Sequence, residues 1–103
     1  MQVSTILATL KAAVLKVQPE ASVILFGSRA RKDNRPDSDF DFLVLSPEKL
    51  TRSQQRAIRE SAYQLELQVG KVLTLLFRTE ADWRGRLSIT PLFKEIEKDG
   101  LRL

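Results

Sequence analysis

Short apolar segments alternate with longer segments of helical periodicity, and this alternation constrains the fold of the chain more than any other feature. The apolar segments lie at 22–26, 39–45 and 72–77 and are bounded by glycine, proline and polar residues. Such segments are typical of strands in a buried sheet. Helical periodicity covers about 4–17 and 51–68. The order predicts an α/β fold in which helices pack against a small mixed three-stranded sheet.

Capping and turn residues mark where the helices should begin and end. Ser4 is the expected N-cap of the first helix, and Thr51 with Gln54 has the pattern of a capping box at the start of the long helix. The other signals are Pro19, Gly70, a capping pattern at 79–82 that opens a short helix through Trp83, the pair Thr90-Pro91 before a last helix over about 91–99, and Gly100 as its C′ glycine.

The lengths of the connections predict how the strands pair. The segment between the first two strands is too short for a crossover helix, so these strands should be antiparallel. A long helix joins the second strand to the third, so that pair should be parallel with a right-handed crossover. The end of the first strand and the starts of the other two are therefore expected at one edge of the sheet.

Composition limits the chemistry that is open to the chain. With 103 residues we expect a single domain, 1–103. The absence of Cys and His excludes disulfides, Cys–His catalysis and Ser–His catalysis, and it argues against a zinc site, since zinc is bound mainly by these two residue types. The net charge of +4 suits phosphates, nucleotides or an acidic partner protein. Because the basic residues are scattered along the sequence, direct nucleic-acid binding is not supported.

Nothing in the sequence indicates a membrane segment. No apolar stretch approaches the ~20 residues that cross a bilayer. Lys11 and Lys16 interrupt what would be the apolar centre of a signal peptide. We therefore expect a cytoplasmic location.

The candidate chemistry is concentrated between the first two strands. Gly27-Ser28 directly follows the first strand, and ten residues later Asp39 and Asp41 open the second. Alternate residues of a strand share a face, so both carboxylates should point the same way, with Phe40 on the opposite face. Two carboxylates without His or Cys predict a site for Mg²⁺ or Mn²⁺.

The residues around Gly27 have the character of a phosphate site. Gly27 allows close backbone approach, and the Ser28 hydroxyl can bond a phosphate oxygen. Arg29 and Arg31 could contact phosphate oxygens through their guanidinium groups, and Ser38 is a further candidate for nucleotide binding. A structural interpretation stays open, in which these arginines only balance the carboxylates of the same segment as surface ion pairs.

FGSRAR followed by SDFDFLVL resembles the minimal nucleotidyltransferases of the DNA polymerase β superfamily, whose signature is GS, about ten residues, then DxD. The resemblance extends over essentially the whole chain. It implies transfer of a nucleoside monophosphate, AMP from ATP above all, to a hydroxyl of a protein or RNA. It also implies that Gly27 and Ser28 hold the triphosphate and that Asp39 and Asp41 ligate Mg²⁺. Minimal members often pair with a HEPN-domain protein as the antitoxin of a toxin–antitoxin system.

One departure from the family pattern separates two functions. The family has a third carboxylate early on the third strand, where this chain has Thr74. Glu66 on the preceding helix is a weak substitute, and Glu80 and Asp82 should lie at the far end of that strand. The chain is therefore either an active nucleotidyltransferase or a catalytically degenerate subunit that binds nucleotide or a partner.

Overall fold

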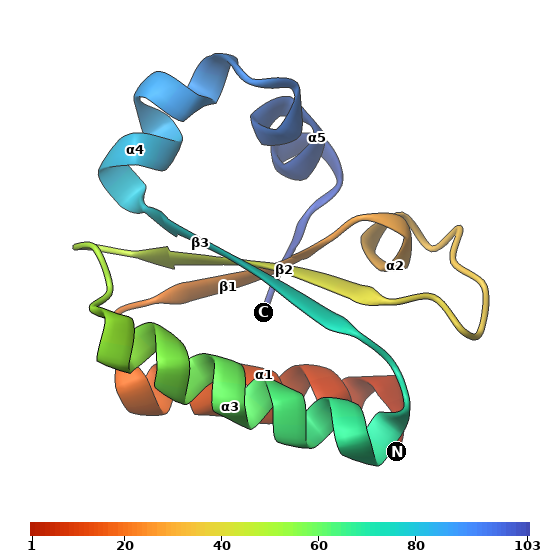
Figure 1. The fold of residues 1–103 in the computed structure, drawn as a ribbon. Coiled ribbons are helices and arrows are strands. Elements are labelled where there is room, and N and C mark those ends of the chain that lie inside the picture. The colour runs from red at the N-terminus through yellow and green to blue at the C-terminus, as the bar shows by residue number, and fades with distance from the viewer.

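The structure, a computed structural model that describes residues 1–103, has three layers, with a mixed four-stranded sheet between two layers of helices (Figure 1). Helices α1 and α3 cover one face, and α4 and α5 cover the other. In chain order the elements are α1 (Val3–Val17), β1 (Ser22–Phe26), α2 (Ser28–Arg31), β2 (Phe40–Ser46), α3 (Arg52–Val69), β3 (Leu73–Thr79), α4 (Glu80–Arg84), the 3₁₀ helix η1 (Arg86–Ile89), α5 (Pro91–Asp99) and β4 (Leu101–Arg102).

The strand pairing confirms the predicted topology. The sheet order is β3-β2-β1-β4, with β1 antiparallel to β2 and β2 parallel to β3. In this register Asp41 is paired with Phe26 on one side and with Thr74 on the other. The end of β1 and the starts of β2 and β3 therefore lie at one edge of the sheet.

Side chains alternate along β2 as expected and pack into two separate hydrophobic cores, one on each face of the sheet. Phe40, Phe42 and Val44 are fully buried in the core beneath α1 and α3. Leu43 and Leu45 pack in the smaller core with Trp83 and Ile96, which come from α4 and α5. Burial on both faces makes β2 the most constrained strand, so the acidic residues at its start stand on a firmly held backbone.

The capping pattern at Thr51 is confirmed, whereas the one at Ser4 is wrong. Thr51 accepts from the backbone N–H of Gln54 at 3.1 Å, and the Gln54 side chain accepts from the backbone N–H of Thr51 at 2.9 Å. At the first helix the N-cap is Gln2, which makes no side-chain cap. The carbonyl of Gln2 already accepts from the N–H groups of residues 5 and 6, so the helix starts before Ser4.

A fourth strand and the helix η1 were missed by the sequence interpretation. β4 has two residues, pairs antiparallel with β1 at Ile24 and Leu25, and is too short for a periodic signal. Gly100 before it has φ of −64°, so it is not a left-handed C′ glycine. A Cβ at Gly100 would lie 2.5 Å from the carbonyl oxygen of Ile96 and 2.9 Å from Cγ2 of Ile24. Close packing, not helix termination, therefore requires glycine there.

None of the helices combines the length and apolar character needed to cross a bilayer.

Candidate functional site

The glycine turn and the acidic pair meet at the edge of the sheet where β1 ends and β2 begins. Gly27 follows Phe26, the residue paired with Asp41. A Cβ added to Gly27 would lie 2.5 Å from Oδ2 of Asp41, which is closer than a real Cβ could approach. Residues 27 and 41 are thus in direct contact in space, as the topology predicts.

Gly27 has a backbone conformation that other residues rarely adopt. Its φ of 78° and ψ of −158° fall in a region that is populated essentially by glycine alone. The turn leads directly into α2, whose Ala30 is buried against the core and fixes the turn in place. The Ser28 hydroxyl makes no hydrogen bond within the chain and remains available to a ligand.

The two carboxylates of the acidic pair have different surroundings. Oδ1 of Asp39 accepts a hydrogen bond from the backbone N–H of Val72 at 3.2 Å, which ties the start of β2 to the start of β3. Partial burial raises the pKa of the Asp41 carboxyl, and the charges of Asp39 and Glu95 raise it further, against a lowering effect of Arg31. Asp41 would therefore gain from a cation that neutralises the pair.

Arg29 and Ser38 serve the loop before β2 in this structure. The Arg29 guanidinium donates to the Ser38 carbonyl at 2.9 and 3.2 Å and to the Pro36 carbonyl at 3.2 Å, and it lies 4.2 Å from the centre of the Phe40 ring. The Ser38 hydroxyl accepts from the backbone N–H of Arg35 at 2.8 Å. Both residues hold the loop against the acidic strand, so a phosphate contact from either one stays a prediction.

Arg31 connects the glycine turn to the last helix. Its guanidinium is 3.1 Å from Oδ2 of Asp33 and 2.8 Å from Oε1 of Glu95 on α5. Glu95 therefore belongs to the electrostatic surroundings of Asp41, as its effect on that pKa shows. The sequence interpretation missed Glu95 because it lies 64 residues from Arg31 and no local pattern relates the two.

No third acidic side chain completes a metal-binding cluster. Thr74 is paired with Asp41 in the parallel register, so it holds the neighbouring position on β3. Glu66 is engaged elsewhere, since its Oε2 accepts from the backbone N–H of Leu73 at 2.7 Å. Glu80 and Asp82 follow the other end of β3, as expected. No group of three or more His, Cys, Asp or Glu residues could hold a metal ion.

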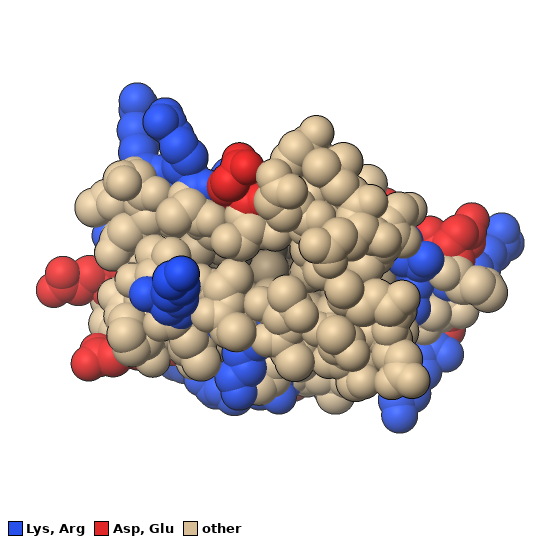
Figure 2. All heavy atoms as spheres, turned by 90° about the horizontal axis from the view of Figure 1, so that it is seen from below, with Lys and Arg blue, Asp and Glu red and all other residues tan.

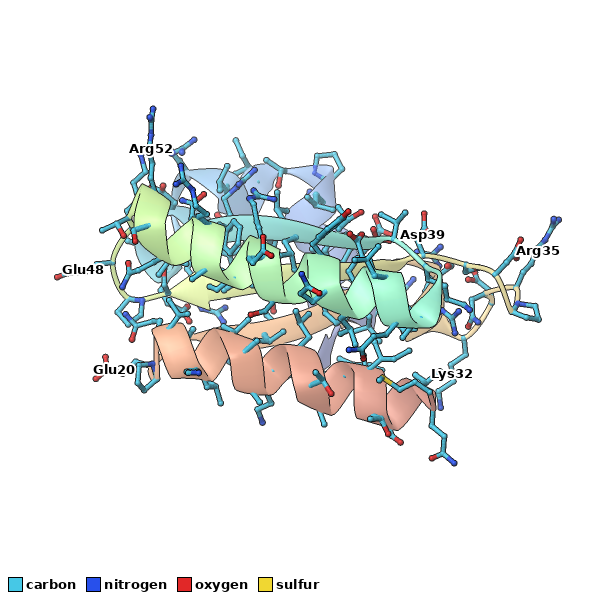
Figure 3. The ribbon with its side chains drawn as sticks, turned by 60° about the horizontal axis from the view of Figure 1, so that its bottom comes forward. Glu20, Lys32, Arg35, Asp39, Glu48 and Arg52 are labelled. Atoms are coloured by element: carbon cyan, nitrogen blue, oxygen red, sulfur yellow. The ribbon has the colours of Figure 1, made fainter.

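The acidic pair nevertheless suits one hard cation. Mg²⁺ in proteins is commonly held by one or two carboxylates, with phosphate oxygens of the substrate and water completing the shell. Asp39 and Asp41 supply two such carboxylates beside the Gly27 turn. The predicted strand start at Asp39 is one residue early, because β2 begins at Phe40 and Asp39 directly precedes it. The figure with side chains shows Asp39 at this edge, beside the start of β3 (Figure 3). The donor set therefore fits one divalent cation bound together with a phosphate ligand.

Comparison with known proteins identifies the family. A family model described as a nucleotidyltransferase domain matches residues 7–103. No curated protein matches the sequence.

Solved structures resemble the fold over almost the whole chain. A chain of a toxin–antitoxin complex with AMP-PNP has a TM-score of 0.63 at 18% identity, covering 98% of this chain and 72% of that one. A structure of the tri-AMPylated Shewanella oneidensis HEPN toxin with its MNT antitoxin gives 0.61 at 18% identity, covering 96% and 69%. A protein assigned as a minimal nucleotidyltransferase gives 0.61 at 24% identity, covering 100% and 97%. At these identities the likeness shows the fold.

Proposed function

Because the chain belongs to the nucleotidyltransferase domain family, we propose that it transfers a nucleoside monophosphate, AMP from ATP, to a hydroxyl group of a protein partner. The observation that supports this proposal most is the contact between the Gly27 turn and the acidic pair at one sheet edge. A triphosphate on the turn would present its phosphates to the same cation that the carboxylates bind.

Each residue of the proposed site has a distinct part. Gly27 and Ser28 bind phosphate oxygens through backbone and hydroxyl groups, and Asp39 and Asp41 hold Mg²⁺. A bound Mg²⁺ would stabilise the charge that develops on the phosphate oxygens. Arg31 can reach a phosphate only by exchanging one of its carboxylate partners, Asp33 or Glu95, for it. Arg29 keeps the loop and the acidic strand in register.

The proposed reaction is a displacement at the α-phosphorus. The acceptor hydroxyl oxygen forms a bond to this phosphorus, the bond from phosphorus to the bridging oxygen breaks, and pyrophosphate leaves with the electron pair. The hydroxyl proton passes to water, because position 74 offers a threonine in place of a carboxylate that could accept it. We therefore expect transfer to be slower than with a complete acidic triad.

We propose a helical HEPN-type protein as the acceptor, with this chain acting as an antitoxin. The support is indirect: a chain of similar fold is the MNT antitoxin in complex with a tri-AMPylated HEPN toxin. In such a complex the partner protein would supply the attacking hydroxyl.

The direct test follows label from α-labelled ATP to a co-expressed HEPN-type partner. We expect transfer that depends on Mg²⁺ and that falls by at least about 100-fold in Asp39→Asn and Asp41→Asn, beyond the loss caused by removing an outer-shell contact. Asp37→Asn is the matched control, because it removes an exposed carboxylate from the same loop. Equal activity of all three variants would contradict the proposed roles.

A second candidate function, a nucleotide-binding or partner-binding subunit without catalysis, is favoured by one observation. Thr74 occupies the position beside Asp41, and no third carboxylate compensates for it. Thr74→Asp separates the two functions. Activity that rises above the wild-type level means that the site is intact and limited by this residue. A complex with the partner that is tight, inactive in every variant and unaffected by Asp39→Asn would assign the chain to the second function.

A further inference from the structure

A hollow lies at the end of the sheet opposite to the acidic pair. It has a volume of about 370 Å³ and lies between the loop after β2, the end of β3, α4 and η1. Three of its lining residues are cationic: Lys49, Arg78 and Arg86. An adjoining, shallower hollow runs along α3 and shares Gln55 with the first. Its cationic residues are Arg52, Arg56 and Arg59.

These six residues, which we call the basic end surface, come from separate parts of the sequence and are gathered by the fold. Figure 2 shows Lys and Arg side chains standing out from the corner where α3 begins. In Figure 3 Arg52 points away from the N-terminal end of α3 into solvent. The fold thus brings cations that are scattered in the sequence to two adjoining hollows.

The charge of the basic end surface is largely unneutralised. Only Arg86 has a carboxylate within 4.0 Å, namely Asp82 at 3.3 Å. Glu60 borders the shallower hollow but accepts from the amide of Gln64 instead of pairing with an arginine. Glu48 precedes Lys49, and its side chain points away from the body of the molecule in Figure 3. Five of the six cations therefore form no ion pair within 4.0 Å, although Glu60 and Asp82 also line the two hollows, and an anionic ligand would stabilise these unpaired cations.

Two of these cations, Arg59 and Arg78, are held in position by Phe77 before any ligand binds. The Arg59 guanidinium lies 4.9 Å from the centre of the Phe77 ring, and Arg78 donates to the Phe77 carbonyl at 2.7 Å. Arg52, Arg56 and Arg59 follow one another at intervals of four and three residues, which places them on one face of the helix. Preorganised donors lose less side-chain entropy on binding.

We propose that the basic end surface binds the phosphodiester backbone of a single-stranded nucleic acid. Five of its six cations are arginines, whose planar guanidinium groups pair with phosphate oxygens bidentately. The hollow is concave and has donors on several sides. It therefore suits a projecting phosphate group better than carboxylates spread over the flat surface of an acidic protein. Tyr63 borders the shallower hollow with 52% of its surface exposed and offers a ring on which a base can stack.

The basic end surface is distinct from the acidic pair. Along β2 the two are separated by the five residue steps from Asp41 to Ser46, or about 17 Å at the rise of a strand. Binding there does not require the nucleotidyl-transfer chemistry. The proposal therefore stands or fails independently of the proposed function.

The test measures fluorescence anisotropy of a labelled oligouridylate of about twelve nucleotides with the full chain. We expect a dissociation constant of about 1–100 μM at low salt, and a plot of log affinity against log salt with a slope of about −2 to −3, as three or four phosphate contacts give. The double variant Arg52→Glu with Arg56→Glu should weaken binding by at least about 10-fold. A change of Tyr63 to Ala should weaken it by about 5-fold or more, as loss of a stacked base does.

The matched control reverses the same number of charges at the other end of the molecule. Lys32→Glu with Arg35→Glu changes two exposed cations on the opposite side in Figure 3 and should leave binding within about 3-fold. An equal loss in this control would overturn the proposal, since net charge alone would explain the binding. Competition by polyglutamate as strong as by RNA would assign the surface to an acidic protein. Equal displacement by free ATP at the same concentration of phosphate groups would assign it to a mononucleotide.

Discussion

At the scale of single residues, the site depends on a backbone position that only glycine can occupy. Gly27 combines a left-handed φ with a Cβ direction that points at the Asp41 carboxylate. Sequence reasoning identified Gly27 as a place of close approach but ascribed that approach to a phosphate. The structure adds a second reason within the chain, because the acidic strand itself fills the space next to this glycine.

We expect Gly27→Ala to be destabilised by about 2–4 kcal/mol, since backbone strain and a clash with Asp41 add together. Gly70→Ala is the matched control: Gly70 has a φ of 70°, and a Cβ there would meet nothing within 4 Å. It should lose only about 1 kcal/mol from strain. Urea unfolding of both variants measures the difference. Equal losses would show that Asp41 does not crowd residue 27.

The raised pKa of Asp41 predicts a pH-dependent cost to stability. Folding holds the proton of this carboxyl more tightly than the unfolded chain does, where the pKa is near 3.8. Stability should therefore fall as the pH rises from about 3.8 through the raised folded-state pKa, and the cost should persist above it. Asp41→Asn removes the cost and should raise the melting temperature near neutral pH.

At about pH 3, roughly one unit below the pKa of the unfolded chain, the same variant should differ little in stability from the wild type. At that pH the Asp41 carboxyl is protonated in both the folded and the unfolded state. Thermal unfolding at the two pH values makes the comparison, with Asp37→Asn as the control for loss of an exposed carboxylate. A variant that is stabilised equally at both pH values would show that the ionised Asp41 carboxylate is not the cause.

At the scale of elements, α3 is fixed at its N-terminus by the reciprocal hydrogen bonds of Thr51 and Gln54. Thr51→Ala removes the cap acceptor for the Gln54 N–H and should cost about 1 kcal/mol in the free energy of unfolding. Ser53→Ala, one residue inside the helix and exposed, is the control and should change stability by less than about 0.5 kcal/mol. Similar losses in both would show that the capping box does not stabilise the helix.

Elements with a strong periodic or capping signal could be predicted from the sequence, and those built by long-range contacts could not. The bounds of β1 and α5 agree with the prediction because Gly27, Pro91 and Thr90 punctuate the chain there. β4 has only two residues and exists because the C-terminal segment pairs with β1. Gly100 was assigned to helix termination because a glycine after a helix is usual, whereas Ile24 and Ile96 leave no room for a side chain.

At the scale of the whole molecule, the sheet topology explains why a short motif could predict so much of the site. Strand pairing alone brings residues 27, 41 and 74 together, and the sequence contained the connection lengths that set this pairing. The Arg31–Glu95 ion pair and the basic end surface depend on how helices pack on the sheet. Such distant juxtapositions leave no trace in local spacing, so the sequence interpretation missed them.

The central claim is that the glycine turn and the acidic pair form one working nucleotide site. An NMR titration of the isotopically labelled chain with Mg²⁺ and a non-hydrolysable ATP analogue tests it most directly. We expect saturable, Mg²⁺-dependent shifts of the amide signals of residues 27–31 and 39–41, and their loss in Asp39→Asn with Asp41→Asn. Absence of shifts at these residues at millimolar nucleotide, or shifts confined to the basic end surface, would contradict the claim.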